Sequence, residues 1–296
     1  MNVRKFAKTI LPPVLTNSIR KSFGGAKGFS APYPTFAAAQ NACGGYAANT
    51  ISETVAAAVS KVLKGEAKFE RDGATFDEIQ YSWPLLAGLM WVAAREGRLR
   101  VCDFGGALGS TYLQNRIFLA DIETTYAVVE QSNFVRCGRS LFDRNRVRFY
   151  EDMEDCIADG PVDVLVLSGV LPYLEDPRTS LDQFMSKGFR YIIIDRTPLL
   201  TEADDRITVQ HVPQSLYTAT YPAWFMNEQK LVEQIEPLYK IVERFDSFES
   251  WNLGDVTAQA RGFILESRRR TTLDLRPTLK RNGAMPSGFW NTFDPS

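Results

Sequence analysis

The chain has 296 residues, which is long enough to bury a full core in one large domain with an extension. Hydrophobic residues make up 45% of it and charged residues 23%, the proportions of an ordinary globular protein. The net charge of −1 does not point to nucleic acid as a partner, and no segment approaches the roughly 18–20 apolar residues of a membrane span.

The first 52 residues contain six basic residues and no acidic one, so they carry +6 and leave −7 for the rest of the chain. Apolar residues between Val3 and Val14 recur beside these charges at near-helical spacing. Such a segment can lie on an anionic membrane surface; the alternatives are a partly disordered or docked arm and an organellar transit peptide. Pro12-Pro13 interrupts the apolar run and argues against a secretory signal.

Two helices are predicted after this arm, over residues 50–64 and 76–95. Pro84 should kink or restart the second helix. The residues of that helix that we expect to face the core are Phe76, Ile79, Trp83, Leu86 and Met90. We therefore assign residues 1–95 to a basic arm and a helical extension.

From residue 96 onward, strand-like and helix-like segments alternate. The predicted strands are 99–104, 125–130, 147–151, 162–168 and 190–196, and the predicted helices are 109–120, 132–142, 153–158 and 179–187. This alternation predicts an α/β fold with a doubly wound, mostly parallel Rossmann-like sheet. The run Val162–Leu167 is almost continuously apolar, as a strand covered on both faces should be.

The end of the domain has a different pattern. A predicted helix over 227–237 precedes two strand-like runs, 239–248 and 261–267, which indicate an antiparallel closing hairpin. An antiparallel final strand distinguishes class I methyltransferases from dehydrogenases. The domain is expected to span 96–267, and residues 268–296 to form a tail.

The most informative segment is the turn that follows the first strand of this domain. Val101–Phe104 runs into Gly105, Gly106 and Gly109, and a helix follows at once, as in the nucleotide crevice of an open α/β sheet. Placing Gly106 and Gly109 on a dinucleotide fingerprint puts Phe104 where its first glycine belongs. The acid-x-Gly-x-Gly-x-Gly pattern of a methyl-donor turn fits better, with Ala107 in place of the middle glycine.

Acidic and small residues follow the next strands at the edge where ligands bind. Glu130 can accept hydrogen bonds from ribose hydroxyls, or is an exposed turn carboxylate. Asp152 is placed to reach an adenine amine, with Met153 beside the ring, or is a helix N-cap. Ser168-Gly169 and Tyr173 follow the fourth strand, between the expected cofactor and the expected substrate.

Several longer strings resemble a bacterial family of class I S-adenosylmethionine-dependent methyltransferases that is often associated with surface-polysaccharide gene sets. They are Phe76–Leu86, Asp103–Ser110, Val129–Gln131, Tyr191–Pro198, Asp205–Gln210 and Tyr221–Phe225. The resemblance implies S-adenosylmethionine as cofactor, and a sugar or glycan precursor as the acceptor. The cofactor-binding residues that we expect are Asp103, Phe104, Gly105, Gly106, Gly109, Ser110, Glu130, Gln131, Asp152, Met153, Ser168 and Gly169.

Residues 199–225 form an insertion with aromatic character, which we interpret as a substrate lid. Asp195 and His211 are the expected general bases for a sugar hydroxyl; the alternatives are a carboxylate that pairs with Arg196 to hold the loop, and a histidine of structural role. The expected substrate-binding residues are Tyr173, Arg196, Tyr217, Tyr221 and Trp224. Two other functions remain open: an NAD(P)-dependent oxidoreductase, and a non-catalytic scaffold that keeps the fold.

Cysteine and histidine are sparse in the chain. Four scattered cysteines without a C-x-x-C pair suit reduced thiols and a cytoplasmic location. His211 is the only histidine, so we expect no zinc site, and the G-x-S-x-G elbow of a Ser-His-Asp hydrolase is missing.

Overall fold

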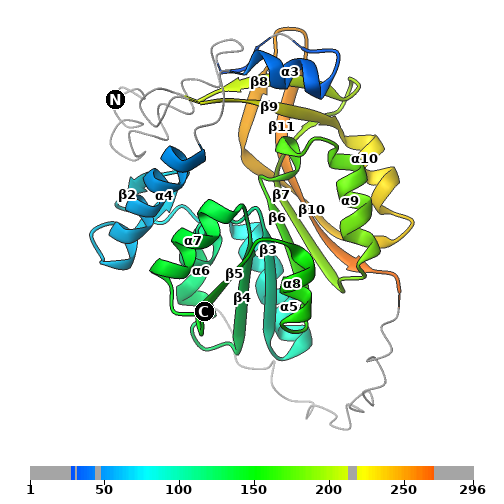
Figure 1. Cartoon of the computed structure of the whole chain (residues 1–296). Helices are drawn as coiled ribbons and strands as arrows, with labels where there is room; N and C mark the ends of the chain where they lie inside the picture. Colours follow the sequence, from blue (N-terminus) through cyan, green and yellow to red (C-terminus); the bar gives the residue numbers. More distant parts are fainter. Residues whose placement is uncertain (1–27, 31, 44–47, 213–218, 270–296) are drawn as a thin grey trace, which may run out of the picture.

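The computed structural model describes residues 28–30, 32–43, 48–212 and 219–269, and its centre is a mixed β-sheet (Figure 1). Five neighbouring strands are parallel, in the order β5-β4-β3-β6-β7. Their bounds are Leu99–Phe104 (β3), Thr124–Val129 (β4), Val147–Tyr150 (β5), Val164–Ser168 (β6) and Tyr191–Leu200 (β7). The predicted doubly wound sheet is confirmed.

Helices cover both faces of this sheet because residues along each strand alternate between two apolar clusters. Val164 and Val166 of β6 face one cluster, and Leu165 and Leu167 face the other. The first cluster includes α4 (Ala48–Leu63), α5 (Trp83–Glu96), α6 (Ser110–Leu119) and α7 (Ser132–Leu141). The second includes α8 (Met153–Ala158), α9 (Pro177–Ser186) and α10 (Glu228–Ile235). None of the helices in the described ranges is long and apolar enough to cross a bilayer.

The predicted antiparallel closing hairpin is present and is longer than expected. It consists of β10 (Tyr239–Asn252) and β11 (Thr257–Ser267). β11 lies between β7 and β10 and is antiparallel to both. The hairpin is long because β7 continues to Leu200, where it still pairs with Ala258 of β11.

The segment before α5 was predicted incorrectly. Residues 76–82 are not helical; instead β1 (Phe69–Arg71) and β2 (Ala74–Phe76) form a small antiparallel hairpin. The helix begins at Trp83 with Pro84 in its first turn, in agreement with the expected restart. The predicted core stripe is wrong for Trp83, which is 57% exposed, and for Met90, which is 36% exposed, because the buried face of α5 is formed by Leu85, Leu86, Leu89, Val92 and Ala93.

Residues 199–225, which we interpreted as a lid, are largely a β-ribbon attached to the sheet. Their main elements are β8 (Arg206–His211) and β9 (Thr220–Asn227), which pair antiparallel, while the end of β9 runs parallel to the end of β7. The helix α3 (Phe36–Ala42) packs on the ribbon through Ala39, Ile207 and Val209 (Figure 1). Tyr217, the N-terminal arm up to residue 27 and most of the predicted tail lie outside the described residues.

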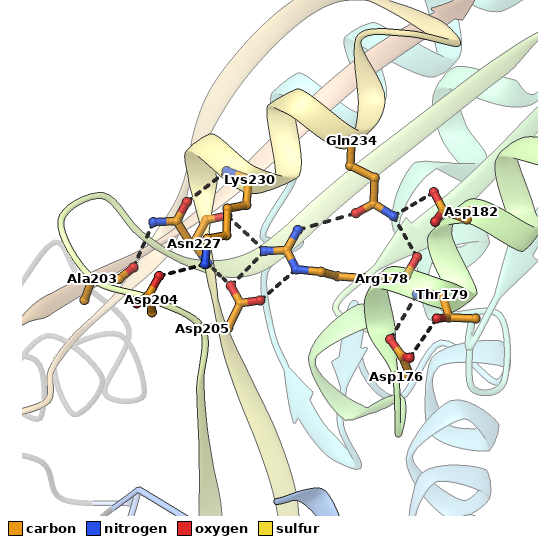
Figure 2. A network of polar contacts seen from close by, with 10 residues as sticks. All are labelled: Asp176, Arg178, Thr179, Asp182, Ala203, Asp204, Asp205, Asn227, Lys230 and Gln234. Atoms are coloured by element: carbon orange, nitrogen blue, oxygen red, sulfur yellow. Dashed lines mark hydrogen bonds and ion pairs between the residues drawn. The ribbon is translucent and has the colours of Figure 1, made fainter. Parts of the chain in front are cut away.

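A network of hydrogen bonds and ion pairs connects the base of this ribbon to α9 and α10 (Figure 2). The guanidinium of Arg178 in α9 binds both carboxylate oxygens of Asp205, with its Nε and Nη2 each 2.7 Å away. Asn227, at the start of α10, donates its side-chain amide to the Ala203 carbonyl at 2.8 Å and accepts from the Lys230 backbone N–H at 2.8 Å. Gln234 of α10 donates to the Arg178 carbonyl at 2.7 Å. The ribbon is therefore anchored at its base, and a hinge at that point is not indicated.

Close packing of the closing hairpin depends on Gly262. A Cβ atom at this position would lie 2.5 Å from the Ile194 carbonyl oxygen and 2.2 Å from Cζ of Phe245. We expect Gly262→Ala to lower the free energy of unfolding by about 3 kcal/mol, because β11 would have to move away from β7. Urea unfolding measures this change.

Gly160→Ala is the matched control, since a Cβ there would meet nothing within 4 Å. We expect it to change stability by less than about 0.5 kcal/mol. Equal effects of the two substitutions would contradict this account of the packing between β7 and β11.

Candidate functional site

The turn between β3 and α6 brings backbone from neighbouring strands close together. Gly105 and Gly109 have positive φ angles of 73° and 75°. The Gly105 N–H donates to the Val129 carbonyl at 2.9 Å, which ties the turn to the end of β4. A Cβ at Gly105 would lie 2.4 Å from Cγ2 of Val170, and one at Gly106 would lie 2.6 Å from the carboxyl carbon of Asp103. These contacts explain why small residues are needed at this turn.

Ala107, the departure from the glycine pattern, also lies in the left-handed region, with a φ of 49°. An L-residue in this conformation costs roughly 1–2 kcal/mol relative to ordinary helical geometry. Its backbone N–H is nevertheless used, because it donates to the Glu130 carboxylate. The turn therefore keeps the glycine-type conformation with an alanine in the middle position.

Three carboxyl groups surround this turn. Asp103, 1% exposed at the end of β3, accepts from the Tyr126 hydroxyl at 2.7 Å, and its Oδ1 has no hydrogen-bond partner among the described residues. Glu130 follows β4 and accepts from the Gln131 N–H at 2.7 Å. Glu70 of β1, 2% exposed, accepts from the Ser110 hydroxyl at 2.7 Å and from the Gly73 N–H at 3.0 Å.

Burial controls the charge of these groups. It raises the pKa of Glu70 to about 7, although the hydrogen bonds from Gly73 and Ser110 favour the carboxylate and lower this pKa. It also raises the pKa of Asp103 to about 7, which the hydroxyls of Tyr126 and Thr111 only partly oppose. Burial raises the pKa of Glu130 as well. A cation bound beside the turn would favour the ionised form of all three carboxyl groups.

Glu70 was not among the sequence-predicted site residues. It was missed because residues 69–76 were not recognised as a hairpin. Asp72-Gly73 between short strand-like runs is a signal for a two-residue turn, and both residues have positive φ angles, 52° and 82°. Glu70 and Arg71 are consecutive residues of β1, so this strand carries an acidic and a basic side chain side by side.

A second group of predicted residues meets where β6 ends, beside the middle of β7. Asp195 is 1% exposed and accepts from the Ser247 hydroxyl at 2.7 Å and from the Arg196 N–H at 2.9 Å. Its own carbonyl accepts from the Gly169 N–H at 2.9 Å. The Asp195 carboxylate thus joins β7 to β10, as in the alternative in which it holds the loop.

Arg196 extends this edge toward the β1–β2 hairpin. Its Nε lies 3.2 Å from Oε1 of Glu249 in β10, and its Nη2 lies 3.8 Å from Oδ2 of Asp72 at the hairpin tip. A Cβ at Gly169 would be 3.8 Å from Nη1 of Arg196, so the guanidinium passes close to the end of β6. Burial opposes the charge of Arg196, yet Glu249, Asp72 and Asp195 raise its pKa.

Two of the predicted aromatic residues lie together beside this edge. Tyr173 follows β6 in a short 3-10 helix (Leu171–Tyr173), and its ring meets that of Tyr221 in β9 edge-to-face at 5.2 Å. The Tyr173 hydroxyl donates to Gln210 of β8 at 2.9 Å. Tyr173 is 42% exposed, so it keeps a surface available to a ligand.

Other predicted residues do not join this edge. His211 follows Gln210 in β8, so its side chain lies on the opposite face of the strand. Trp224 is likewise on the opposite face of β9 from Tyr221, and it packs against two apolar clusters. Strand alternation turns both side chains away from Tyr173, and the roles of His211 as a base and of Trp224 as a substrate contact stay predictions.

The nucleobase side of the predicted site contains a cavity of about 460 Å³. Phe104, Asp152, Met153 and Leu174 line it together with polar residues of α9. The Asp152 carboxylate accepts from the Asp155 N–H at 2.7 Å and is the N-cap of α8, as in the structural alternative for this residue. Gln131 is the N-cap residue of α7.

No family model matches this chain, and no curated protein matches it. Among solved structures, the N-terminal domain of EvdMO1 in the presence of SAH and D-fucose is similar, with 16% identity, 76% of this chain and 98% of that chain covered, and a TM-score of 0.43. A Burkholderia thailandensis 1,6-didemethyltoxoflavin-N1-methyltransferase with bound 1,6-didemethyltoxoflavin and S-adenosylhomocysteine has 14% identity, 81% and 93% coverage, and a TM-score of 0.38. An S-adenosylmethionine-dependent methyltransferase from Clostridium acetobutylicum ATCC 824 has 8% identity, 71% and 96% coverage, and a TM-score of 0.40. Values this low do not establish a function.

Two effects of a side chain at Gly105 on stability can be measured separately: the clash with Val170 and the cost of a positive φ angle. Gly97→Ala is the control, because Gly97 has a φ of 70° and nothing within 4 Å of its added Cβ. We expect Gly97→Ala to cost about 1 kcal/mol and Gly105→Ala about 3 kcal/mol or more in urea unfolding. Equal costs would mean that Val170 does not constrain the turn.

Replacing Glu70 by glutamine should change how stability depends on pH. Because burial raises the pKa of Glu70 from 4.5 to about 7, its contribution to stability is fully present below the unfolded value and is lost as the pH rises through 7. Relative to Glu70→Gln, the unfolding free energy of the ligand-free wild type should fall by roughly 3 kcal/mol between pH 4.5 and 8. Denaturant unfolding across this range measures the difference.

In the Glu70→Gln protein the new side-chain amide could still accept from the Gly73 N–H and donate to the Ser110 oxygen, so the substitution preserves the local bonds. Glu66→Gln, at an exposed position of the preceding loop, is the control and should reproduce the wild-type pH dependence. A Glu70→Gln protein with the wild-type profile would refute the assignment of a buried titrating carboxyl.

Proposed function

We propose that this chain is an S-adenosylmethionine-dependent methyltransferase. The observation that carries the proposal is the set of carboxyl groups around the turn after β3, where Glu70 and Asp103 are buried and Glu130 is half-buried, because a bound cation would favour their ionised forms. S-adenosylmethionine is a sulfonium with an additional ammonium group, so its charge complements these residues. The arrangement of β11 between β7 and β10 supports the same choice.

The same carboxyl groups argue against an NAD(P)-dependent oxidoreductase. A dinucleotide places its pyrophosphate at the N-terminus of the helix that follows the glycine turn. Here Ser110, the first residue of α6, donates its hydroxyl to Glu70. An anionic pyrophosphate at this position would face a carboxyl group, and its binding would be opposed.

The described residues fit the methyl donor along its whole length. Asp103, with an unpartnered buried oxygen, and Glu70 suit the cationic end. Glu130 at the end of β4 suits the ribose hydroxyls, and the cavity lined by Phe104, Asp152 and Met153 suits the nucleobase. When bound, this cofactor supplies a methyl group on a sulfonium that is already activated for attack.

The residues of this chain then have the task of alignment, which can supply much of the rate enhancement of a displacement reaction. Tyr173 and Tyr221 offer aromatic surface to an acceptor. A sugar or glycan precursor is the acceptor that the sequence resemblance suggests. Asp195 is 1% exposed, its Oδ1 accepts from Ser247 and Arg196, and its Oδ2 lies 3.5 Å from the Ser168 hydroxyl, so we assign it to positioning rather than to proton removal.

Calorimetric titration with S-adenosylhomocysteine and with NADH tests this proposal. We expect binding of the first and none of the second. Glu130→Gln should weaken S-adenosylhomocysteine at least about tenfold, since it removes a charged acceptor for hydroxyl donors. Glu123→Gln, exposed just before β4 at its opposite end, should leave the affinity unchanged.

Binding of NADH without binding of S-adenosylhomocysteine would reverse the proposal. Binding of S-adenosylhomocysteine without transfer of a labelled methyl group to any acceptor in extracts of the native host would favour a non-catalytic scaffold.

A further inference from the structure

The tip of the β1–β2 hairpin touches the edge formed by β7 and β10. Asp72 at the tip lies 3.8 Å from the Arg196 guanidinium, which in turn lies 3.2 Å from Glu249. Arg71 is the residue before Asp72, and the charges of Arg196, Glu249, Asp72 and Asp195 all affect its pKa. We call Arg71, Asp72, Asp195, Arg196 and Glu249 the acceptor edge.

The two arginines of the acceptor edge differ in how their charges are balanced. Arg196 has carboxylate partners in Asp72 and Glu249. Arg71 is half-buried, and the Phe69 ring lies 5.4 Å from its guanidinium carbon. Within the described residues, no carboxylate forms an ion pair or hydrogen bond with the Arg71 guanidinium. Burial and the neighbouring charge of Arg196 lower the pKa of Arg71, whereas the carboxylates of Glu249, Asp72 and Asp195 act in the opposite direction.

The backbone that carries Arg71 is held firmly. Glu70 on one side binds Ser110 and the Gly73 N–H, and Asp72 on the other side contacts Arg196. The rings of Phe69 and Phe76 pack at 5.8 Å across the hairpin. A cation fixed in this way loses little freedom when a ligand binds.

We propose that Arg71 binds an anionic group of the methyl acceptor, a carboxylate or a phosphate ester, so that the acceptor is an acidic molecule. The inference rests on the proposed function. A guanidinium presents parallel N–H donors that match both groups. Arg71 directly precedes Asp72, whose carboxylate lies 3.8 Å from the Arg196 guanidinium in β7, and this contact puts Arg71 on the acceptor side of the proposed site.

The test uses the full chain saturated with S-adenosylhomocysteine, with inorganic phosphate and glucuronate as anionic probes and glucose as the neutral probe. Binding is followed by intrinsic tryptophan fluorescence and calorimetry. We expect both anions to bind the wild type more tightly than glucose, Arg71→Gln to weaken them at least about tenfold, and Arg71→Lys to retain part of the affinity. Lys68→Gln, an exposed cation next to the same hairpin, should leave their affinity unchanged.

A second measurement decides whether Arg71 binds the acceptor or the carboxylate of the methyl donor. The affinity for S-adenosylhomocysteine should stay within about threefold in Arg71→Gln. A tenfold loss that is seen with S-adenosylhomocysteine and not with 5′-methylthioadenosine, which lacks the amino-acid part, would assign Arg71 to the donor and overturn the inference. Equal binding of the anions to wild type and Arg71→Gln, or no binding of either anion to the wild type, would also overturn it.

These outcomes remain distinct from the failure of the proposed function. A wild type that binds S-adenosylhomocysteine and neither anion overturns only the role of Arg71. A wild type that binds the anions through Arg71 but not S-adenosylhomocysteine overturns the methyltransferase assignment and with it the acceptor role. Thermal unfolding of Arg71→Gln, Arg71→Lys and Lys68→Gln identifies any loss that comes from the fold.

Discussion

Burying the carboxyl groups of Glu70 and Asp103 beside one glycine turn, with Glu130 half-buried next to them, costs free energy that the packing of the rest of the molecule has to offset. Asp103 ends a fully covered strand and therefore cannot reach water, and Glu70 is closed in by the hairpin that carries it. The sheet is covered by helices on both faces, so its strand ends are rigid enough to hold these groups in place. The turn is thus a destabilised site within a well-packed frame, which is common where a ligand completes the electrostatics.

The β1–β2 hairpin joins the two halves of the site. Glu70 binds Ser110 beside the turn after β3, and Asp72 contacts Arg196 in β7. Arg71 lies between Glu70 and Asp72 in the sequence. These contacts cross from the extension before the sheet to its centre, so the extension is part of the site rather than an appendage. At the far edge, β10 contributes Ser247 and Glu249 from one face of a strand, two residues apart.

Much of the fold could be predicted because the central strands are continuous apolar runs and the helices between them have clear starting signals. The bounds of α8 agree with the prediction, and Asp152 is the N-cap that its sequence position allowed. The hairpin of Glu70 and Arg71 was missed because its strands have three residues each and the helical spacing that continues from Phe76 to Met90 was the stronger pattern. Short strands carry too few residues for alternation to be recognised.

The residues around the glycine turn could be placed together from the sequence more completely than the residues around Arg196, for a physical reason. Donor residues follow consecutive strands, so chain order alone places Asp103, Glu130 and Ser168 at one edge. The partners of Arg196 are residues 72 and 249, and nothing local in the sequence relates them to it. His211 and Trp224 were assigned to the site by their chemistry, whereas the alternation of β8 and β9 decides their direction.

The pairing register of the small hairpin has a consequence for the two ligands. Consecutive residues of a strand point to opposite sides, so under the proposed function Glu70 would face the donor and Arg71 the acceptor. A slip of one residue in this hairpin would exchange the signs and make both positions repulsive. The two-residue turn at Asp72-Gly73, with its pair of positive φ angles, therefore fixes the charge polarity of the whole site as well as the shape of a loop.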